Sequence, residues 1–181
     1  ELRFEKLAYL LEADPWDRPF TVNDVGCGYG EMFRYLDARF GSRMERYHGY
    51  DISANMLDAA RSHISDPRAE LIESSDVERR ADYSFVSGTF HVRRGADEDA
   101  WREYVQRMIR RLSEQSTRGF AFNLFTTYVD FRNDDLFYAD PAEFFTFCRR
   151  ELSRYVTLLH DYPLYEWTIV VLQERAFDSA R

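Results

Sequence analysis

The residues best suited to chemistry in this 181-residue chain are three alternating glycines that follow a short β-type run. Gly26, Gly28 and Gly30 come directly after Val25, and a helical pattern begins at Glu31. Glycine has no Cβ, so it adopts positive φ and lets another molecule approach the backbone closely. The start of a helix also leaves backbone N–H groups free to bind a ligand. The spacing therefore predicts a strand, a tight turn and a helix that together bind a ligand.

Two carboxylates accompany this turn. Asp51 follows a second β-type run, 21 residues beyond Gly30, and an acid about 20 residues after such a turn binds ribose in nucleotide-binding units. Asp24 lies two residues before Gly26, where it would repel a pyrophosphate and attract an ammonium or sulfonium group. The third glycine also comes one residue earlier than in the dinucleotide motif G-x-G-x-x-G. The pattern favours a positively charged, adenosine-bearing cofactor over a purely structural glycine turn.

The elements that must position these residues alternate between strand and helix. The patterns predict strands over 20–25, 47–52, 69–73, 83–87, 118–125, 155–159 and 165–173, and helices over 2–13, 31–40, 53–64, 97–114 and 141–151. Such alternation predicts a parallel sheet with helices on both faces. The connection between the strands 155–159 and 165–173 is too short for a parallel crossover, so the final strand should run antiparallel to the one before it. We expect one α/β domain over residues 1–181, with a seven-stranded, mostly parallel sheet.

The sequence Asp-x-Gly-x-Gly-x-Gly from Asp24 to Gly30 resembles the first motif of class I S-adenosylmethionine-dependent methyltransferases. Together with the segments 87–93, 123–141 and 160–162, it is similar to small bacterial methyltransferases that are often encoded among sugar or natural-product genes. The resemblance implies S-adenosyl-L-methionine as the cofactor and an antiparallel last strand. Relatives usually carry a preceding segment that helps close the cofactor pocket, so in this chain, which starts at Glu1, we expect a partly open pocket.

The resemblance also implies cofactor roles for individual residues. Asp51 would accept hydrogen bonds from both ribose hydroxyls, and Asp24 would lie beside the methionine part. Asp76 would accept from the adenine amino group, and Val77 would donate its backbone N–H to the ring. The alternative for Asp76 is that it only caps a turn. The remaining expected cofactor contacts are Gly26, Gly28, Gly30, Ile52, Met56 and Ser87, although a methionine at helical spacing is also typical of a core.

Three residues are candidates for the catalytic side. His91 and His160 follow predicted strands, so both should face the pocket, where an imidazole can take a proton near neutral pH. The alternative is that each histidine only hydrogen-bonds to backbone. Tyr128 lies in an aromatic loop of 15 residues, from Thr126 to Asp140, which is longer than an ordinary connection. This loop could wall a substrate pocket, and a self-packed loop or a contact in a homodimer remains equally open.

Other features narrow the reaction and the partners. The segment after residue 86 lacks both the base-holding motif of DNA amino-methyltransferases and an acidic cluster for a metal, so we expect metal-free transfer to O or N of a small molecule. A net charge of −8 argues against nucleic-acid and anionic-membrane partners. Two isolated cysteines, no long apolar run and no signal peptide indicate the cytoplasm.

Two alternative functions remain. The first is an NAD(P)-dependent reductase on a similar sheet, against which the early third glycine and the absence of a Tyr-x-x-x-Lys pair argue; Lys6 is the sole lysine. The second is a non-catalytic S-adenosylmethionine-binding partner subunit. The intact glycines and Asp51 favour an active enzyme over this second alternative.

Overall fold

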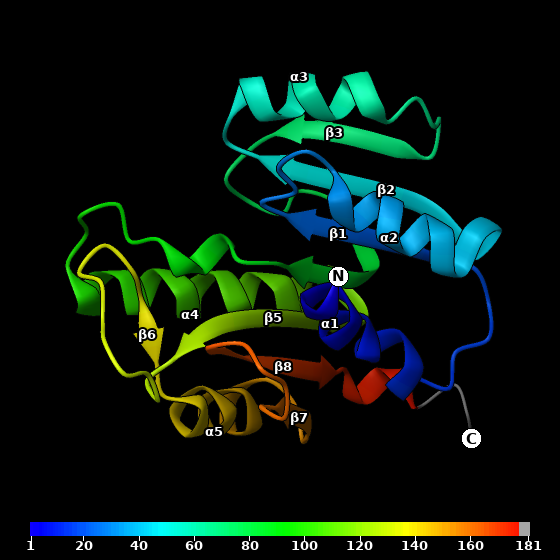
Figure 1. Cartoon of the computed structure of the whole chain (residues 1–181). Helices are drawn as coiled ribbons and strands as arrows, with labels where there is room; N and C mark the ends of the chain where they lie inside the picture. Colours follow the sequence, from blue (N-terminus) through cyan, green and yellow to red (C-terminus); the bar gives the residue numbers. More distant parts are fainter. Residues whose placement is uncertain (178–181) are drawn as a thin grey trace.

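The computed structural model describes residues 1–177 and is built around one mixed sheet (Figure 1). Within these residues the sheet has eight strands in the order β3-β2-β1-β4-β5-β8-β7, with β6 paired to β5. The strands are β1 (Phe20–Val25), β2 (Met44–Asp51), β3 (Ala69–Glu73), β4 (Ala81–Val86), β5 (Ser116–Thr126), β6 (Tyr138–Ala139), β7 (Tyr155–Leu159) and β8 (Glu166–Leu172).

The strand directions confirm the predicted mostly parallel sheet. β3, β2, β1, β4 and β5 pair in parallel with their neighbours, whereas β8 is antiparallel to both β5 and β7. The expected count of seven strands is wrong by one, because Tyr138 and Ala139 pair with the end of β5 inside the loop predicted to be irregular. A pairing of two residues has no hydrophobic period, so the sequence pattern could not reveal it.

Five α-helices of the described part of the chain lie where the periodicity predicted them. They are α1 (Leu2–Ala13), α2 (Glu31–Phe40), α3 (Ala54–His63), α4 (Glu98–Gln115) and α5 (Pro141–Glu151). Side-chain oxygens of Ser53, Asp97 and Asp140 cap the amino ends of α3, α4 and α5, which satisfies N–H groups that have no partner within a helix. No helix of the described residues is long and apolar enough to cross a membrane.

Alternating side chains of the central strands supply two hydrophobic clusters, one on each face of the sheet. In β8, Trp167, Ile169 and Val171 belong to one cluster, and Val170 and Leu172 belong to the other. Helices α4 and α5 contribute buried side chains to the first cluster, and α1 and α2 contribute to the second. Because both faces are covered, these strands read in the sequence as nearly continuous apolar runs, which is how they could be recognised.

The strand order reverses beside β1. The chain runs from β1 through β2 to β3, and then returns to the other side of β1 to form β4. Ligands of open α/β sheets bind at the carboxyl ends of the strands near such a reversal. Because β8 is antiparallel, its first residue, Glu166, pairs with Phe125 near the end of β5. Glu166 therefore lies at the same edge as the glycine turn.

Candidate active site

The turn after β1 is held against β2 by its own backbone. The amides of Gly26 and Cys27 both donate to the carbonyl of Tyr50, at 2.7 and 2.9 Å. Gly26, Gly28 and Gly30 have φ values of +74°, +53° and +81°, and Gly30 is the residue that precedes α2. The predicted strand, turn and helix are thus confirmed, and the turn needs residues that adopt positive φ.

The three glycines serve different purposes. A Cβ at Gly26 would stand 2.0 Å from Oγ1 of Thr89, and one at Gly30 would stand 2.2 Å from Cδ1 of Ile64. These two glycines therefore permit close packing within the protein. A Cβ at Gly28 would meet nothing within 4 Å, so its backbone is the part of the turn that another molecule can approach.

Asp51 is fixed at the end of β2 by two backbone groups. Its Oδ2 accepts from the amide of Gly28 at 3.0 Å, and its Oδ1 accepts from the amide of Ser53 at 2.9 Å. A carboxylate oxygen has two lone pairs, so each oxygen can accept a further hydrogen bond. The carboxylate is therefore oriented in advance for a ligand that offers two hydroxyls.

Asp24 is buried on the other side of the turn, with 1% of its surface exposed. Its Oδ2 accepts from the hydroxyl of Tyr47, whereas its Oδ1 has no hydrogen-bond partner among the described residues. Burial, opposed by the Tyr47 hydrogen bond and helped by the charge of Asp51, raises the pKa of Asp24 to about 7. A cationic group beside Oδ1 would stabilise the ionised form and satisfy the free oxygen.

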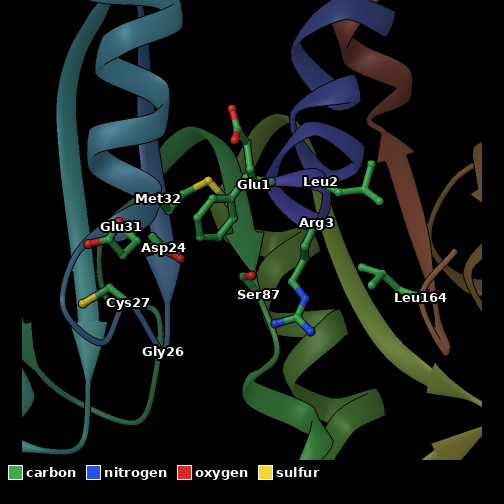
Figure 2. A pocket seen from close by; sticks show the side chains of 11 residues that line it. Glu1, Leu2, Arg3, Asp24, Gly26, Cys27, Glu31, Met32, Ser87 and Leu164 are labelled. Atoms are coloured by element: carbon green, nitrogen blue, oxygen red, sulfur yellow. The ribbon is translucent and has the colours of Figure 1, made fainter. Parts of the chain in front are cut away.

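Two cavities meet at this edge of the sheet. The Asp24 cavity, of about 420 Å³, lies between the glycine turn and the first residues of α1, and Figure 2 shows Asp24 and Ser87 directed into it. The Asp51 cavity, of about 660 Å³, is lined by Asp51, Ser74, Gly88, His91, Trp101 and Phe125, among others. Both cavities are lined by Arg3, Gly26 and Ser87. A ligand that lies along the turn can thus extend from one cavity into the other.

Of the four cofactor candidates after β2 and β3 other than Asp51, one lines the Asp51 cavity and three do not. Ile52, which is 55% exposed, lines the Asp51 cavity. Asp76 and Val77 are not among its lining residues: Val77 is fully buried, and Asp76 pairs with Arg111 at 3.2 Å and also accepts from the amide of Val77 at 2.7 Å. Met56 is partly buried on α3, where its amide donates to the hydroxyl of Ser53.

The three catalytic candidates are not brought together. His91 is buried and lines the Asp51 cavity. His160 and Tyr128 are both exposed, lie with their rings 6.0 Å apart, and line neither cavity. The reason lies in the strand order: β5 and β8 lie between β4, which precedes His91, and β7, which precedes His160.

His91 has a defined environment. Its ring stacks on Phe125 with the centroids 3.9 Å apart, and its Nε2 has no hydrogen-bond partner among the described residues. Oε2 of the Glu166 carboxylate lies 3.9 Å from this nitrogen. Burial and the positive charge of Arg3 lower the pKa of His91 to about 3, so the imidazole is neutral near pH 7.

Sequence reasoning missed several residues of the site. Arg3 binds Glu166 through Nε and Nη2 at 2.8 to 3.1 Å, although 163 positions separate them. Ser74 and Ser75 line the Asp51 cavity in the segment where Asp76 was expected to do so. The available signal was Glu166 itself, a charged residue at the start of an otherwise apolar strand.

No group of three or more His, Cys, Asp or Glu residues among residues 1–177 could hold a metal ion.

Comparisons with known proteins agree with this geometry. Residues 22–115 match the model of a family described as a methyltransferase domain. The chain is 44% identical over 156 residues to the Mycobacterium tuberculosis protein named "Putative methyltransferase Rv1506c", with 84% of this chain and 93% of the relative covered.

Solved structures share the fold at low identity. Magnesium protoporphyrin IX methyltransferase from Synechocystis PCC 6803, crystallised with S-adenosylmethionine, has a TM-score of 0.67 at 12% identity and covers 96% of this chain and 78% of its own. The plantazolicin methyltransferase BpumL, in complex with a monoazolic desmethylPZN analog and S-adenosylhomocysteine, has a TM-score of 0.68 at 11% identity, with 97% of this chain and 86% of that chain covered. The chain belongs to the class I S-adenosylmethionine-dependent methyltransferases.

Proposed function

We propose that this protein methylates an oxygen or nitrogen of a small-molecule acceptor by direct in-line transfer, without a metal. The observation that carries the proposal is the meeting of the two cavities at Gly26 and Ser87. Asp24, whose Oδ1 has no hydrogen-bond partner among the described residues, lines one cavity, and Asp51, whose carboxylate is oriented by two amides, lines the other. A cofactor held by both would present its sulfonium group near their junction.

The residues present fit S-adenosylmethionine. Asp24 offers a buried, unpaired acceptor to the ammonium group, and the open side of Gly28 lets the backbone approach the ligand. Asp51 offers unused lone pairs to the ribose hydroxyls. Ile52, Ser74 and Ser75 line the cavity on the side where the adenine would lie. Within residues 1–177, Asp76 uses only its Oδ1 for Arg111 and Val77, so its Oδ2 is free to accept a hydrogen bond from the adenine amino group.

The bound cofactor supplies a methyl group that is already activated by its sulfonium. The protein therefore mainly has to align the acceptor atom, the methyl carbon and the leaving sulfur. Holding reactants in this way can contribute roughly 7–11 kcal/mol to lowering the barrier. Ser87 and Gly88 at the end of β4 provide no carboxylate ligand for a metal, so the proposal includes none.

A methyl-transfer assay tests this function. The purified protein would be incubated with methyl-labelled S-adenosylmethionine and a library of hydroxyl-, carboxyl- and amine-bearing metabolites. We expect one acceptor class to gain the label while S-adenosylhomocysteine accumulates, and Asp51→Ala to lose both signals. Tight binding of S-adenosylhomocysteine without transfer to any compound would favour the non-catalytic partner subunit instead. Family membership already argues against the reductase.

A further inference from the structure

We propose that the acceptor is an oxygen nucleophile, a hydroxyl or a carboxylate, and that it binds between Nη1 of Arg3 and Nδ1 of His91. This inference rests on the proposed function and specifies its acceptor. Arg3 and His91 come from distant parts of the sequence: one lies on the first turn of α1 and the other on the turn that follows β4. Both line the Asp51 cavity.

Gly88 defines the space between these two groups. A Cβ built on Gly88 would stand 3.2 Å from Nη1 of Arg3 and 3.7 Å from Nδ1 of His91. Both nitrogens therefore flank the side of Gly88 from which a side chain would project, and a ligand atom in van der Waals contact with this open side can lie within reach of both. Gly88 also lines the cavity, next to Ser87, which both cavities share. The space therefore lies beside the junction where the methyl group would pass to the acceptor.

Arg3 provides a free donor at this point. Its Nε and Nη2 are engaged by the carboxylate of Glu166, whereas Nη1 makes no hydrogen bond within residues 1–177. The pairing fixes the guanidinium plane and leaves Nη1 directed toward Gly88. It also offsets the positive charge of Arg3, which reduces its repulsion of a nearby sulfonium. Arg3 can therefore donate a charge-assisted hydrogen bond without a large electrostatic cost to the cofactor.

His91 provides a neutral acceptor on the opposite side. The ring is 5% exposed and its stacking on Phe125 limits its rotation. The Glu166 carboxylate lies 3.9 Å from Nε2, and its negative charge favours the tautomer in which Nε2 carries the hydrogen. Nδ1, on the Gly88 side, then has a free lone pair. The neutral state follows from burial and from Arg3, which keep the pKa of His91 well below neutral pH.

This pair of groups distinguishes oxygen from nitrogen. A hydroxyl can accept from Nη1 of Arg3 and donate to Nδ1 of His91 at the same time, and a carboxylate can accept from Arg3. An ammonium group has no lone pair with which to accept from Nη1, and a neutral amine that accepts from Nη1 has no lone pair left to attack the methyl carbon. A second positively charged side chain, Arg94, also lines this cavity and favours an anionic acceptor over a cationic one. The carboxylate that lines it, Asp51, is held at the ribose side by Gly28 and Ser53.

The acceptor, the cofactor and His91 together account for every bond, electron pair and proton in the methyl transfer. A lone pair of the acceptor oxygen forms the new bond to the methyl carbon while the carbon–sulfur bond breaks and its electrons remain on sulfur. A hydroxyl proton passes to Nδ1 of His91 and from there to solvent. A carboxylate has no proton to lose, so for that acceptor His91 would only help to shape the space.

Binding of three matched probes tests the inference without knowledge of the natural acceptor. Benzyl alcohol, benzoate and benzylamine would be titrated separately into the protein saturated with S-adenosylhomocysteine, while NMR follows the ring signals of His91 and the side-chain Nε signal of Arg3. We expect both oxygen probes to shift these signals, and benzylamine to bind at least about tenfold more weakly.

A pair of glycine variants provides the control. Gly88→Ala should fill the space between Arg3 and His91, so it should abolish binding of the oxygen probes and preserve binding of S-adenosylhomocysteine. Gly95→Ala introduces the same atom at a similar φ, +79° against +75°, where a Cβ would meet nothing within 4 Å. It should leave both kinds of binding unchanged, which separates occupation of the space from backbone strain.

The outcomes distinguish the inference from the proposed function. Equal or tighter binding of benzylamine, no signal shift with either oxygen probe, or unchanged probe binding in folded Gly88→Ala would overturn the oxygen assignment. In each of these cases the protein would still bind S-adenosylhomocysteine, so the proposed function would survive. If the unaltered protein failed to bind S-adenosylhomocysteine at all, the proposed function would fail and the inference would fail with it.

Discussion

The amide nitrogen of Gly28 lies 3.0 Å from Oδ2 of Asp51, so the turn after β1 and the acid after β2 are joined directly by a hydrogen bond. The same carboxylate is also held by the amide of Ser53. A side chain fixed by two backbone donors loses little further freedom when a ligand binds. The arrangement therefore prepares the ribose site and stabilises the glycine turn at the same time.

Replacing Asp51 by alanine should weaken binding of S-adenosylhomocysteine and leave the fold intact. Each charge-assisted hydrogen bond lost is worth about 1.5–3 kcal/mol, and the turn also loses the acceptor for Gly28. Isothermal titration calorimetry measures the effect. Asp58→Ala is a suitable control, because Asp58 is an exposed carboxylate on α3 that pairs only with Arg61 among the described residues. Wild-type affinity in folded Asp51→Ala would contradict the ribose assignment.

Valine at position 28 should abolish cofactor binding. The substitution places a branched side chain where the backbone must be approached, at φ +53°, and costs roughly 1–3 kcal/mol of stability through strain. Gly41→Val tests the strain alone, because Gly41 has φ +52°, a Cβ there would meet nothing within 4 Å, and it lines neither cavity. Thermal unfolding and calorimetry on both variants should show lost stability in each and lost binding only in Gly28→Val. Equal binding by the two variants would mean that the turn does not contact the cofactor.

Replacing Asp24 by asparagine should stabilise the protein at alkaline pH and weaken its binding of the cofactor. Burial raises the pKa of Asp24 to about 7, so between about pH 4 and pH 7 the folded state keeps a proton that the unfolded chain loses. The free energy of unfolding contributed by this group therefore falls as pH rises through that range. Asparagine does not titrate, and its carbonyl can still accept from the hydroxyl of Tyr47.

Urea unfolding at pH 5 and pH 8 measures this difference. The stability advantage of Asp24→Asn should grow between these values, by on the order of 2–4 kcal/mol at most. In the unaltered protein, affinity for S-adenosylhomocysteine should rise with pH as Asp24 ionises and level off above about pH 7. If the stability of Asp24→Asn and that of the unaltered protein changed equally between pH 5 and pH 8, Asp24 would not titrate in this range.

Removal of the buried histidine should affect the transfer step more than cofactor binding. Once an acceptor has been identified, His91→Ala should lower kcat by ~10²–10⁴ for a hydroxyl acceptor, while the affinity for S-adenosylhomocysteine stays within about twofold. His160→Ala removes an exposed imidazole outside both cavities and is the matched comparison. A larger loss of turnover in His160→Ala than in His91→Ala would place the acceptor elsewhere.

Much of the fold was predictable because each element carries a local signal. The apolar run in β8, the glycines after Val25 and the proline that begins α5 all depend on residues close together in sequence. The antiparallel last strand followed from one short connection. These predictions needed no knowledge of which distant residues meet.

The acceptor side was less predictable because it depends on long-range contacts. The pair formed by Arg3 and Glu166 spans 163 positions, and neither residue belongs to a local motif. The expectation that His91 and His160 share a pocket followed from parallel strands alone. It did not account for the two strands that separate β4 from β7 in the sheet.

The most direct test of the account is calorimetric titration of the purified protein with S-adenosylhomocysteine and, separately, with NADPH. The arrangement of Asp24, Gly28 and Asp51 predicts one S-adenosylhomocysteine site per chain, lost in Gly28→Val and retained in Gly41→Val, with no measurable NADPH binding. Binding of NADPH in place of S-adenosylhomocysteine, or S-adenosylhomocysteine binding that survives in both Gly28→Val and Asp51→Ala, would contradict the assignment of the cofactor site.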